Sequence, residues 1–456
     1  MTRGRSLLVV LFLLTLPLVT PRIRASDEIE YFAYLPSVLF DHDLEFGNEY
    51  QYFYDRSPRT LELFRGTFLE KREPETGRHI NFGPVGSAVL WSPFYLAAHA
   101  AVVAARAIGF PAVADGLSPP YVAAICYASA LYGFLGFLLI HDALRRFGAV
   151  GEPAASWSAA ALWLGTPALY YMTVAPGFSH APSLFVVSLL VWLWLRARAD
   201  GGGSVGAWAL VGAVGGLAAL VREQDGLFLA APAAWLVLEA ARRRSPAFGA
   251  LRLVALGGAA AAAFAPQLVV YKTLTGGYHP SRMVSGKLDF TSPHFLEVLF
   301  DPGHGLFVWT PVLLVAALGL VWAWSRRRDS VAALLLLALA LQVWINGALS
   351  TWTQGGAFGS RRFVGATAVF AWGLAAVLTS VLPDLRRCLA AGGLAFLVWW
   401  NVSLMVQFGL RLMDRQKLEW PRVAINQVVE VPPRLGRVVW LLATDRERLA
   451  REGAQP

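Results

Sequence analysis

The sequence predicts an all-α membrane protein, a polytopic bundle of about eleven transmembrane helices with interfacial helices in the first outer loop. Hydrophobic residues make up 56% of the 456 positions and charged residues only 15%, whereas soluble proteins average about 25% charged residues. Seventeen tryptophans and 42 glycines are typical of membrane bundles, in which Trp lies at the interfaces and Gly allows close helix contact. The net charge of +9 comes from arginines at the ends of apolar runs, a distribution that does not indicate nucleic-acid binding.

The apolar runs predict the individual helices, because a span requires about 20 mostly apolar residues. Such runs lie at 6–23, 84–105, 119–141, 153–174, 178–197, 204–221, 226–241, 249–272, 305–325, 330–349, 362–383 and 388–409.

The first run fits either a retained span or a cleaved signal peptide, since Arg3 and Arg5 precede it and Arg24 occupies the expected cleavage region. Either interpretation places the following loop outside.

The arginine clusters then test how many runs cross the membrane, because clustered Arg and Lys favour the cytoplasmic side. Twelve crossings would place several of the clusters outside, whereas omitting the run at 84–105 places all five inside. We therefore expect 84–105 to lie in the outer interface or to re-enter the bilayer. The five clusters are Arg145-Arg146, Arg196/Arg198, Arg242–Arg244, Arg326–Arg328 and Arg386-Arg387.

This topology predicts a single polytopic domain over residues 1–410, with large outer loops at about 24–118 and 273–304. A polar tail, 411–456, follows on the outer face. Most of the unusual polar residues fall in outer loops, so a functional site is expected on that face.

The first outer loop carries adjacent carboxylates, Asp27-Glu28, directly after the first apolar run, followed by Asp43. A carboxylate near low dielectric can serve as a general base. A hydrated turn that merely ends the helix explains the same residues equally well.

Together these positions resemble the GT-C glycosyltransferases, in particular the protein O-mannosyltransferase and aminoarabinose-transferase group known as family 39. The resemblance rests on Asp27-Glu28 after the first span, the aromatic pair Tyr31-Phe32, and Asp43-Leu44 about sixteen residues later. The segment 78–84 stands where the family has a basic, proline-containing stretch. The family's Lys-Pro-Pro sequence is absent there, which leaves the phosphate ligands open.

The resemblance implies transfer of a sugar from a polyprenyl-phosphate-linked donor to an acceptor hydroxyl, with inversion and with no required cofactor. Asp27 is then the base, and Glu28 is a second carboxylate that orients the acceptor or substitutes for Asp27.

The candidate substrate-binding residues are polar groups on the outer face, chosen because a departing phosphate needs cations. Arg222 and Asp225 lie in a short turn between two spans, where a local ion pair is the alternative. Arg361 and Arg362 follow glycines that expose backbone amides, and His304 opens a helix whose N-terminus can face an anion. The full set is Asp43, Arg78, His79, Asn81, His180, Arg222, Asp225, His279, Arg282, His304, Arg361 and Arg362. We expect Asp27, Arg222 and Arg361 or Arg362 to line one cavity.

No metal site is predicted, because no His-x-x-x-His or similar ligand spacing occurs; a divalent cation is possible. The expected partners are the lipid-linked donor, a glycan, lipid or protein acceptor, and the bilayer. The expected location is a bacterial inner or plasma membrane, with the active site on the periplasmic or extracellular face. The alternative function is a lipid or glycan transporter or flippase, although no internal repeat supports it.

Overall fold

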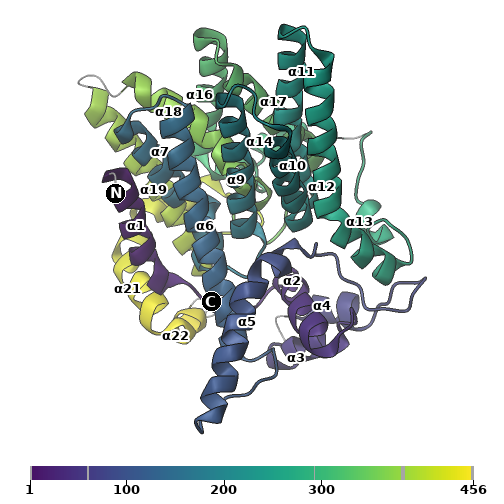
Figure 1. Ribbon diagram of the computed structural model, residues 1–456. Coiled ribbons are helices and arrows are strands. Elements are labelled where there is room, and N and C mark those ends of the chain that lie inside the picture. The colour runs from purple at the N-terminus through teal and green to yellow at the C-terminus, as the bar shows by residue number, and fades with distance from the viewer. Residues whose placement is uncertain (1–2, 59–60, 292, 382–385, 453–456) are drawn as a thin grey trace.

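The computed structural model describes residues 3–58, 61–291, 293–381 and 386–452. Over these ranges the regular structure is helical, and the β-pairings are two isolated bridges, Arg72–His79 and Leu288–Leu349. The predicted all-α fold class is therefore confirmed (Figure 1).

The long helices form a bundle that ends, at the bottom of Figure 1, on a layer of shorter helices. The bundle contains α6 Pro119–Phe147, α7 Glu152–Leu164, α8 Pro167–Thr173, α9 His180–Ala199, α10 Val205–Val221, α11 Ala230–Arg242, α12 Pro246–Thr275, α16 Pro311–Arg327, α17 Ser330–Gly347, α18 Thr367–Val381 and α19 Arg386–Gly409. The first loop contributes α2 Ser26–Pro36, α3 Gly47–Arg56, α4 Glu62–Phe64 and α5 Gly86–Ala107. Helix α1 Arg3–Thr15 precedes them, and the second loop holds α13 Arg282–Ser285, α14 Phe295–Phe300 and α15 Leu306–Trp309.

Seven of the described helices are long and apolar enough to cross a membrane, and α10 is a shorter apolar helix. Several predicted spans form shorter helices instead. The run at 153–174, for example, breaks between α7 and α8, where Thr166 accepts a hydrogen bond from the backbone of Ala168. The number of crossings, about eleven, stays a prediction.

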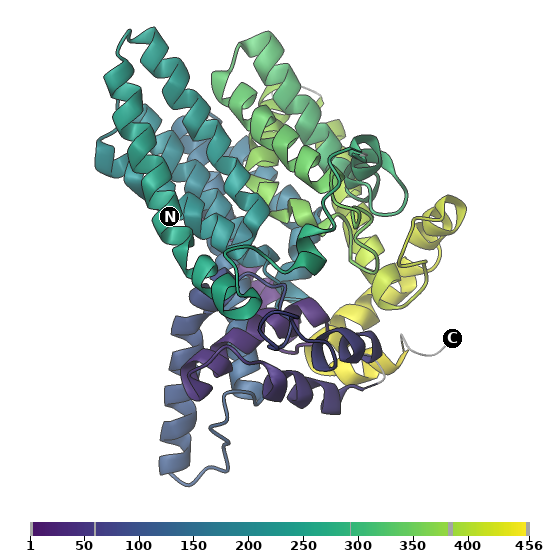
Figure 2. The same cartoon turned by 90° about the vertical axis from the view of Figure 1, so that its right-hand side faces the viewer.

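Helix α5 has the length and composition of a span, but only 22% of its apolar window is buried. It extends beyond the lower end of the bundle beside α2 and α3 (Figures 1 and 2). Its first residue, Gly86, lies so close to the backbone of Leu220 that any Cβ would overlap it. The non-crossing interpretation of this helix stays a prediction.

The arginine clusters lie at the opposite end of the bundle from this layer. Asp142 near the end of α6 pairs with both Arg146 and Arg5, and Arg198 at the end of α9 donates to Ser330 at the start of α17. Arg243, after α11, donates to the carbonyl of Gly201. We call this the arginine end and the opposite one the loop end. The side chains of Arg386 and Arg387 lie outside the described residues.

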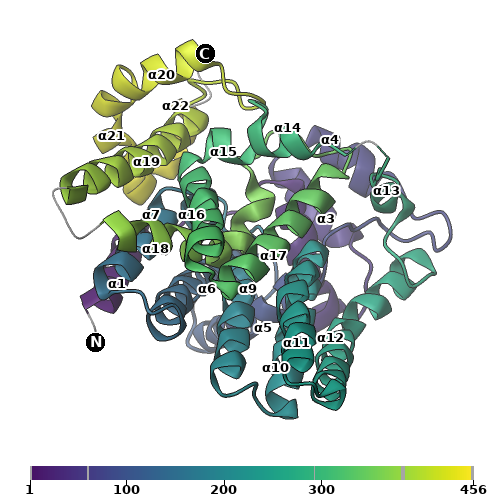
Figure 3. The same cartoon turned by 90° about the horizontal axis from the view of Figure 1, so that it is seen from above.

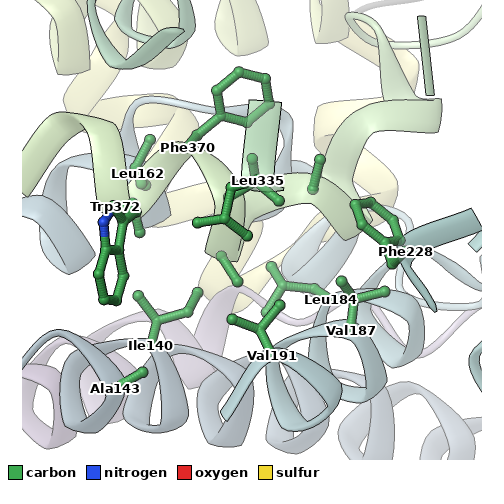
Figure 4. Close-up of a cluster of buried hydrophobic side chains, with 14 of the residues drawn as sticks. Ile140, Ala143, Leu162, Leu184, Val187, Val191, Phe228, Leu335, Phe370 and Trp372 are labelled. Carbon is green, nitrogen blue, oxygen red and sulfur yellow. The ribbon is translucent and has the colours of Figure 1, made fainter. Parts of the chain in front are cut away.

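The core that positions the loop end is built around α9 and α18. Leu184, Val187 and Val191 of α9 meet Leu335 of α17 and Phe370 of α18 (Figure 4). Figure 4 also shows Ile140, Ala143, Leu162, Phe228 and Trp372 around them. At the loop end, the short 3₁₀ helix η5 Arg361–Ala366 leads into α18. Its Gly365 leaves no room for a Cβ against Ser183 of α9, so η5 packs directly on the start of α9.

The C-terminal segment, predicted as a polar tail, forms three helices: α20 Trp420–Val428, α21 Val431–Thr444 and α22 Arg446–Glu452. They lie along α19 at one edge of the molecule (Figure 3). Arg446 donates to the carbonyl of Pro17, and Glu447 pairs with Arg22 at 2.9 Å. The segment is thus packed against the chain that follows α1.

Candidate functional site

The centre of the candidate site is an ion pair between the first loop and η5. Asp27, in the first turn of α2, lies with its Oδ2 2.8 Å from Nη1 of Arg361. The side chain of Asp27 is 40% exposed and that of Arg361 20% exposed. The carboxylate therefore remains open to a ligand, whereas the arginine is largely enclosed.

The turn after α10 brings a further cation to the start of α9, where Arg361 also lies. Arg222, after α10, directs Nη1 to Ser179 Oγ at 3.1 Å and to His180 Nδ1 at 3.2 Å, at the start of α9. The guanidinium of Arg361 lies 5.0 Å from the ring centroid of Phe178. Asp27, Arg222 and Arg361 are thus linked through contacts with one another and with residues 178–180, while the cavity that they are predicted to line stays a prediction.

Arg362 is held by a network that sequence reasoning missed. Its Nη2 donates to Thr351 Oγ1 at 3.0 Å, and Gln224 Nε2 donates to its carbonyl at 2.8 Å. Gln342 of α17 in turn donates to the carbonyl of Gln224. The only signal for this role in the sequence is Gln342, a glutamine within the apolar run at 330–349.

The site contains buried hydrogen-bond donors that lack partners within the described structure. They are Nε2 of His180, Nε of Arg222 and Nη1 of Arg362. An unpaired buried donor costs about 1–3 kcal/mol, so such groups favour a bound acceptor. Three unpaired donors and three arginines beside the exposed carboxylate of Asp27 suit an anion with several oxygens, such as a phosphate.

Glu28 differs from Asp27 although the two residues are adjacent. Its Oε2 accepts hydrogen bonds from the backbone of Arg24 at 2.8 Å and Ala25 at 3.0 Å, so it caps α2. Burial raises the pKa of Glu28 to about 7. The structure thus gives Glu28 a capping role, and its predicted catalytic role stays a prediction.

Glu30 is a buried carboxylate that the sequence analysis did not select. Its Oε2 accepts from the backbone of Phe82 at 2.6 Å and Gly83 at 3.1 Å, and burial together with the nearby Asp27 raises its pKa. Asn81 donates to the carbonyl of Glu30 at 3.0 Å. The predicted substrate ligand Asn81 therefore joins the segment 81–83 to α2.

Three other predicted ligands are engaged within the first loop. Asp43 accepts from Ser37 Oγ and from the backbone of Glu45. His79 contacts the carboxylate of Glu45 through Nδ1. Arg78 donates to the carbonyl of Leu44 at 3.3 Å. These contacts indicate that the three residues shape the loop, and their substrate-binding role stays a prediction.

Asp225 and His304 also have structural partners. Ser183 Oγ donates to Asp225 Oδ2 at 2.6 Å, which joins the turn after α10 to α9. His304 places Nε2 2.8 Å from the carbonyl of Ala357 and stacks on Trp309 with centroids 4.8 Å apart. His304 thus braces the glycine-rich loop 355–359 instead of presenting a free nitrogen to an anion.

His279 and Arg282 line a separate cavity of about 350 Å³ between the two outer loops. Arg282 pairs there with Glu75 at 3.4 Å. The other lining residues are Lys71, Arg72, Glu73, Pro74, Ile80, Thr275, Ser281 and Met283.

Within the part of the chain that the structure describes, no three His, Cys, Asp or Glu side chains lie close enough to hold a metal ion. Asp27 faces arginines, so the donor set around it suits an anion better than a cation.

The comparisons with known proteins concern the fold. No protein-family model and no curated protein matches the sequence. The solved archaeal oligosaccharyltransferase AglB from Archaeoglobus fulgidus, in complex with an inhibitory peptide and a dolichol-phosphate, aligns with a TM-score of 0.50 at 14% identity, over 98% of this chain and 56% of that one.

Two other solved structures align less closely. The apo oligosaccharyltransferase of the same organism aligns with a TM-score of 0.48 at 15% identity, over 100% of this chain and 56% of that one. ArnT from Cupriavidus metallidurans, bound to undecaprenyl phosphate, aligns with a TM-score of 0.47 at 17% identity, over 98% of this chain and 76% of that one. The chain thus spans little more than half the length of the oligosaccharyltransferases. The chain has a GT-C type of fold, as the resemblance implied, while the family 39 assignment stays a prediction.

Proposed function

We propose that the chain is a membrane glycosyltransferase that moves a sugar from a polyprenyl-phosphate-linked donor to an acceptor hydroxyl on the non-cytoplasmic face. The observation that carries this proposal is the ion pair of Asp27 and Arg361, set among unpaired buried donors on Arg222, His180 and Arg362. A base beside a set of phosphate ligands is what such a transfer requires.

In the proposed reaction, Asp27 takes the proton of the acceptor hydroxyl as its oxygen forms a bond to the anomeric carbon. The bond from that carbon to the phosphate oxygen breaks, and its electron pair leaves with the polyprenyl phosphate. Because the acceptor attacks from the face opposite the phosphate, the anomeric configuration is inverted. The phosphate is already a good leaving group, so the mechanism needs no separate acid.

Arg361 links binding to chemistry in this mechanism. Without a donor, its guanidinium holds Asp27 at 2.8 Å and competes with any proton that Asp27 would accept. An incoming donor phosphate offers Arg361 a second anionic partner, and a shift of the guanidinium toward it frees the carboxylate for the acceptor. Arg222 and Arg362, each with an unpaired buried nitrogen, supply further donors to the same phosphate.

The proposed face follows from the two ends of the bundle. Asp27 and Arg361 lie at the loop end, opposite the ends where Arg5, Arg198 and Arg243 make their contacts. Positively charged loops favour the cytoplasm, which supports a site on the periplasmic or extracellular side. The AglB structure holds a dolichol-phosphate, the class of lipid proposed here for the donor.

The test is a transfer assay on the full chain, purified and reconstituted in proteoliposomes. Radiolabelled polyprenyl-phosphate sugars are supplied singly, with a lipid and glycan extract as acceptor, and labelled product and released polyprenyl phosphate are both measured. At least one donor should give a labelled product. A donor that crosses the bilayer without any loss of its sugar would instead identify a transporter.

A further inference from the structure

The chain turns back along α19 after this helix ends at Gly409. The ring of Trp420, at the start of α20, stacks on Trp400 with centroids 5.4 Å apart. Trp400 precedes Gly409 by nine residues, which is about 13 Å along a helix axis. Since residues 388–409 of α19 form a candidate span, Trp420 lies beside the span and not beyond its end.

The polarity of the two faces of α20 is the reverse of that of a helix on the surface of a soluble protein. Its inner face carries Asn426 and Gln427, both buried. Asn426 Nδ2 donates to Gln407 Oε1 of α19 at 3.2 Å and to the carbonyl of Leu412 at 2.9 Å. Its outer face carries Ile425, 58% exposed, and Val428, 76% exposed; Arg422, in the first turn, is also exposed and pairs with Glu419 just before the helix. In water the polar face points outward, whereas in lipid the polar groups must find partners inside.

The apolar outer face continues the lipid-facing surface of α19. Leu389 and Phe396 of α19 are exposed apolar residues on a candidate span. Helix α21 packs Val431 and Val438 against Val406 of α19, and its exposed face carries Arg434 and Arg437 as well as Trp440. Figure 3 shows α20 and α21 beside α19 at the edge of the molecule. Tryptophan in such a place is typical of a membrane interface.

We propose that α20 re-enters the bilayer at the loop end and lies with its outer face against lipid acyl chains. The segment predicted as a polar tail in water would then be part of the membrane domain. It also touches the candidate site, because Gln416 Oε1 accepts from the backbone of Gly356 at 3.0 Å and Leu418 donates to the carbonyl of Pro302. A lipid-anchored α20 thus braces the glycine-rich loop that leads to Arg361.

The test is spin-label accessibility in nanodiscs, which requires no activity and stands apart from the proposed function. Cys126 and Cys388 are first replaced by serine. A single label is then placed by Ile425→Cys or Val428→Cys. Val254→Cys, at a 72% exposed position on the candidate span α12, is the lipid-facing control. Lys417→Cys, three residues before α20, is the aqueous control.

Collision with oxygen should exceed collision with a water-soluble nickel chelate at positions 425 and 428, as at 254, and the order should reverse at 417. Greater collision with the nickel chelate at 425 and 428 would place α20 in water and overturn the proposal. Exclusion of both reagents, with dipolar broadening between labels, would show that a second copy covers this face and would overturn it as well. Far-UV circular dichroism and gel filtration confirm that each variant is folded.

Discussion

The most informative perturbation is Asp27→Asn, because it removes the ability of this side chain to accept a proton while it keeps the shape of the side chain. Asparagine keeps the size of the side chain and can still accept a hydrogen bond from Arg361, but it cannot take up the acceptor proton. Loss of a general base lowers the rate by about 10²–10⁴, which corresponds to about 3–5 kcal/mol of activation free energy. The ion pair itself is modest, since the carboxylate is 40% exposed, and pairs of this exposure contribute about 0.2–1 kcal/mol.

The assay compares the initial rate of sugar transfer with the thermal unfolding of the same preparation. Asp27→Asn should lose at least a hundredfold in rate while its melting temperature changes little and its donor binding persists. Glu447→Gln is the matched control, because it removes another long-range pair, Arg22–Glu447 at 2.9 Å, away from the site. If Asp27→Asn transfers sugar at the rate of this control, the assignment of Asp27 as the base is wrong.

Three further substitutions test the remaining roles. Burial raises the pKa of Glu28 to about 7 from a usual 4.5, so the folded state binds its proton more tightly and the free energy of unfolding falls as pH rises between those values. Glu28→Gln should therefore be more stable than wild type at pH 8, by up to about 3 kcal/mol, equally stable at pH 4.5, and still active; inactivity would move the base to Glu28. Arg362→Ala should weaken polyprenyl-phosphate binding by about ten- to a hundredfold through loss of a charge-assisted hydrogen bond of about 1.5–3 kcal/mol, and an unchanged dissociation constant would remove Arg362 from the phosphate site. His304→Ala should lower the free energy of unfolding by about 2–4 kcal/mol through its lost hydrogen bond and ring stacking; an unchanged melting temperature with weaker donor binding would return His304 to the ligand set.

The sequence by itself determined the fold class and the location of the first carboxylates. Hydropathy over about 20 residues is a local property, so it predicts spans such as α6, α9 and α12 without knowledge of their neighbours. The arginine clusters are local as well, and the contacts of Arg5, Arg198 and Arg243 place them together at one end of the bundle.

The shorter helices show where local reasoning fails. Residues 153–174 are mostly apolar and carry no charge, but the helix ends before Thr166 and a new one, α8, begins after it. The C-terminal segment has many charges, yet α20 buries Asn426 against α19 and exposes the apolar side chains of Ile425 and Val428. Average polarity cannot reveal such an inversion, because it depends on which face meets a partner.

Only the tertiary structure decided which outer-face residues belong to the site. Asp27 and Glu28 are adjacent carboxylates in the sequence. In the structure Glu28 accepts a hydrogen bond from the backbone of Arg24 just before α2, whereas Asp27 pairs with Arg361. Among the cations, Arg222 and Arg361 converge because Gly365 allows η5 to pack against α9, while Arg78 remains within the first loop. The physical reason is that a site requires contact between segments far apart in the chain, and such contacts are set by the packing of the helices that carry them.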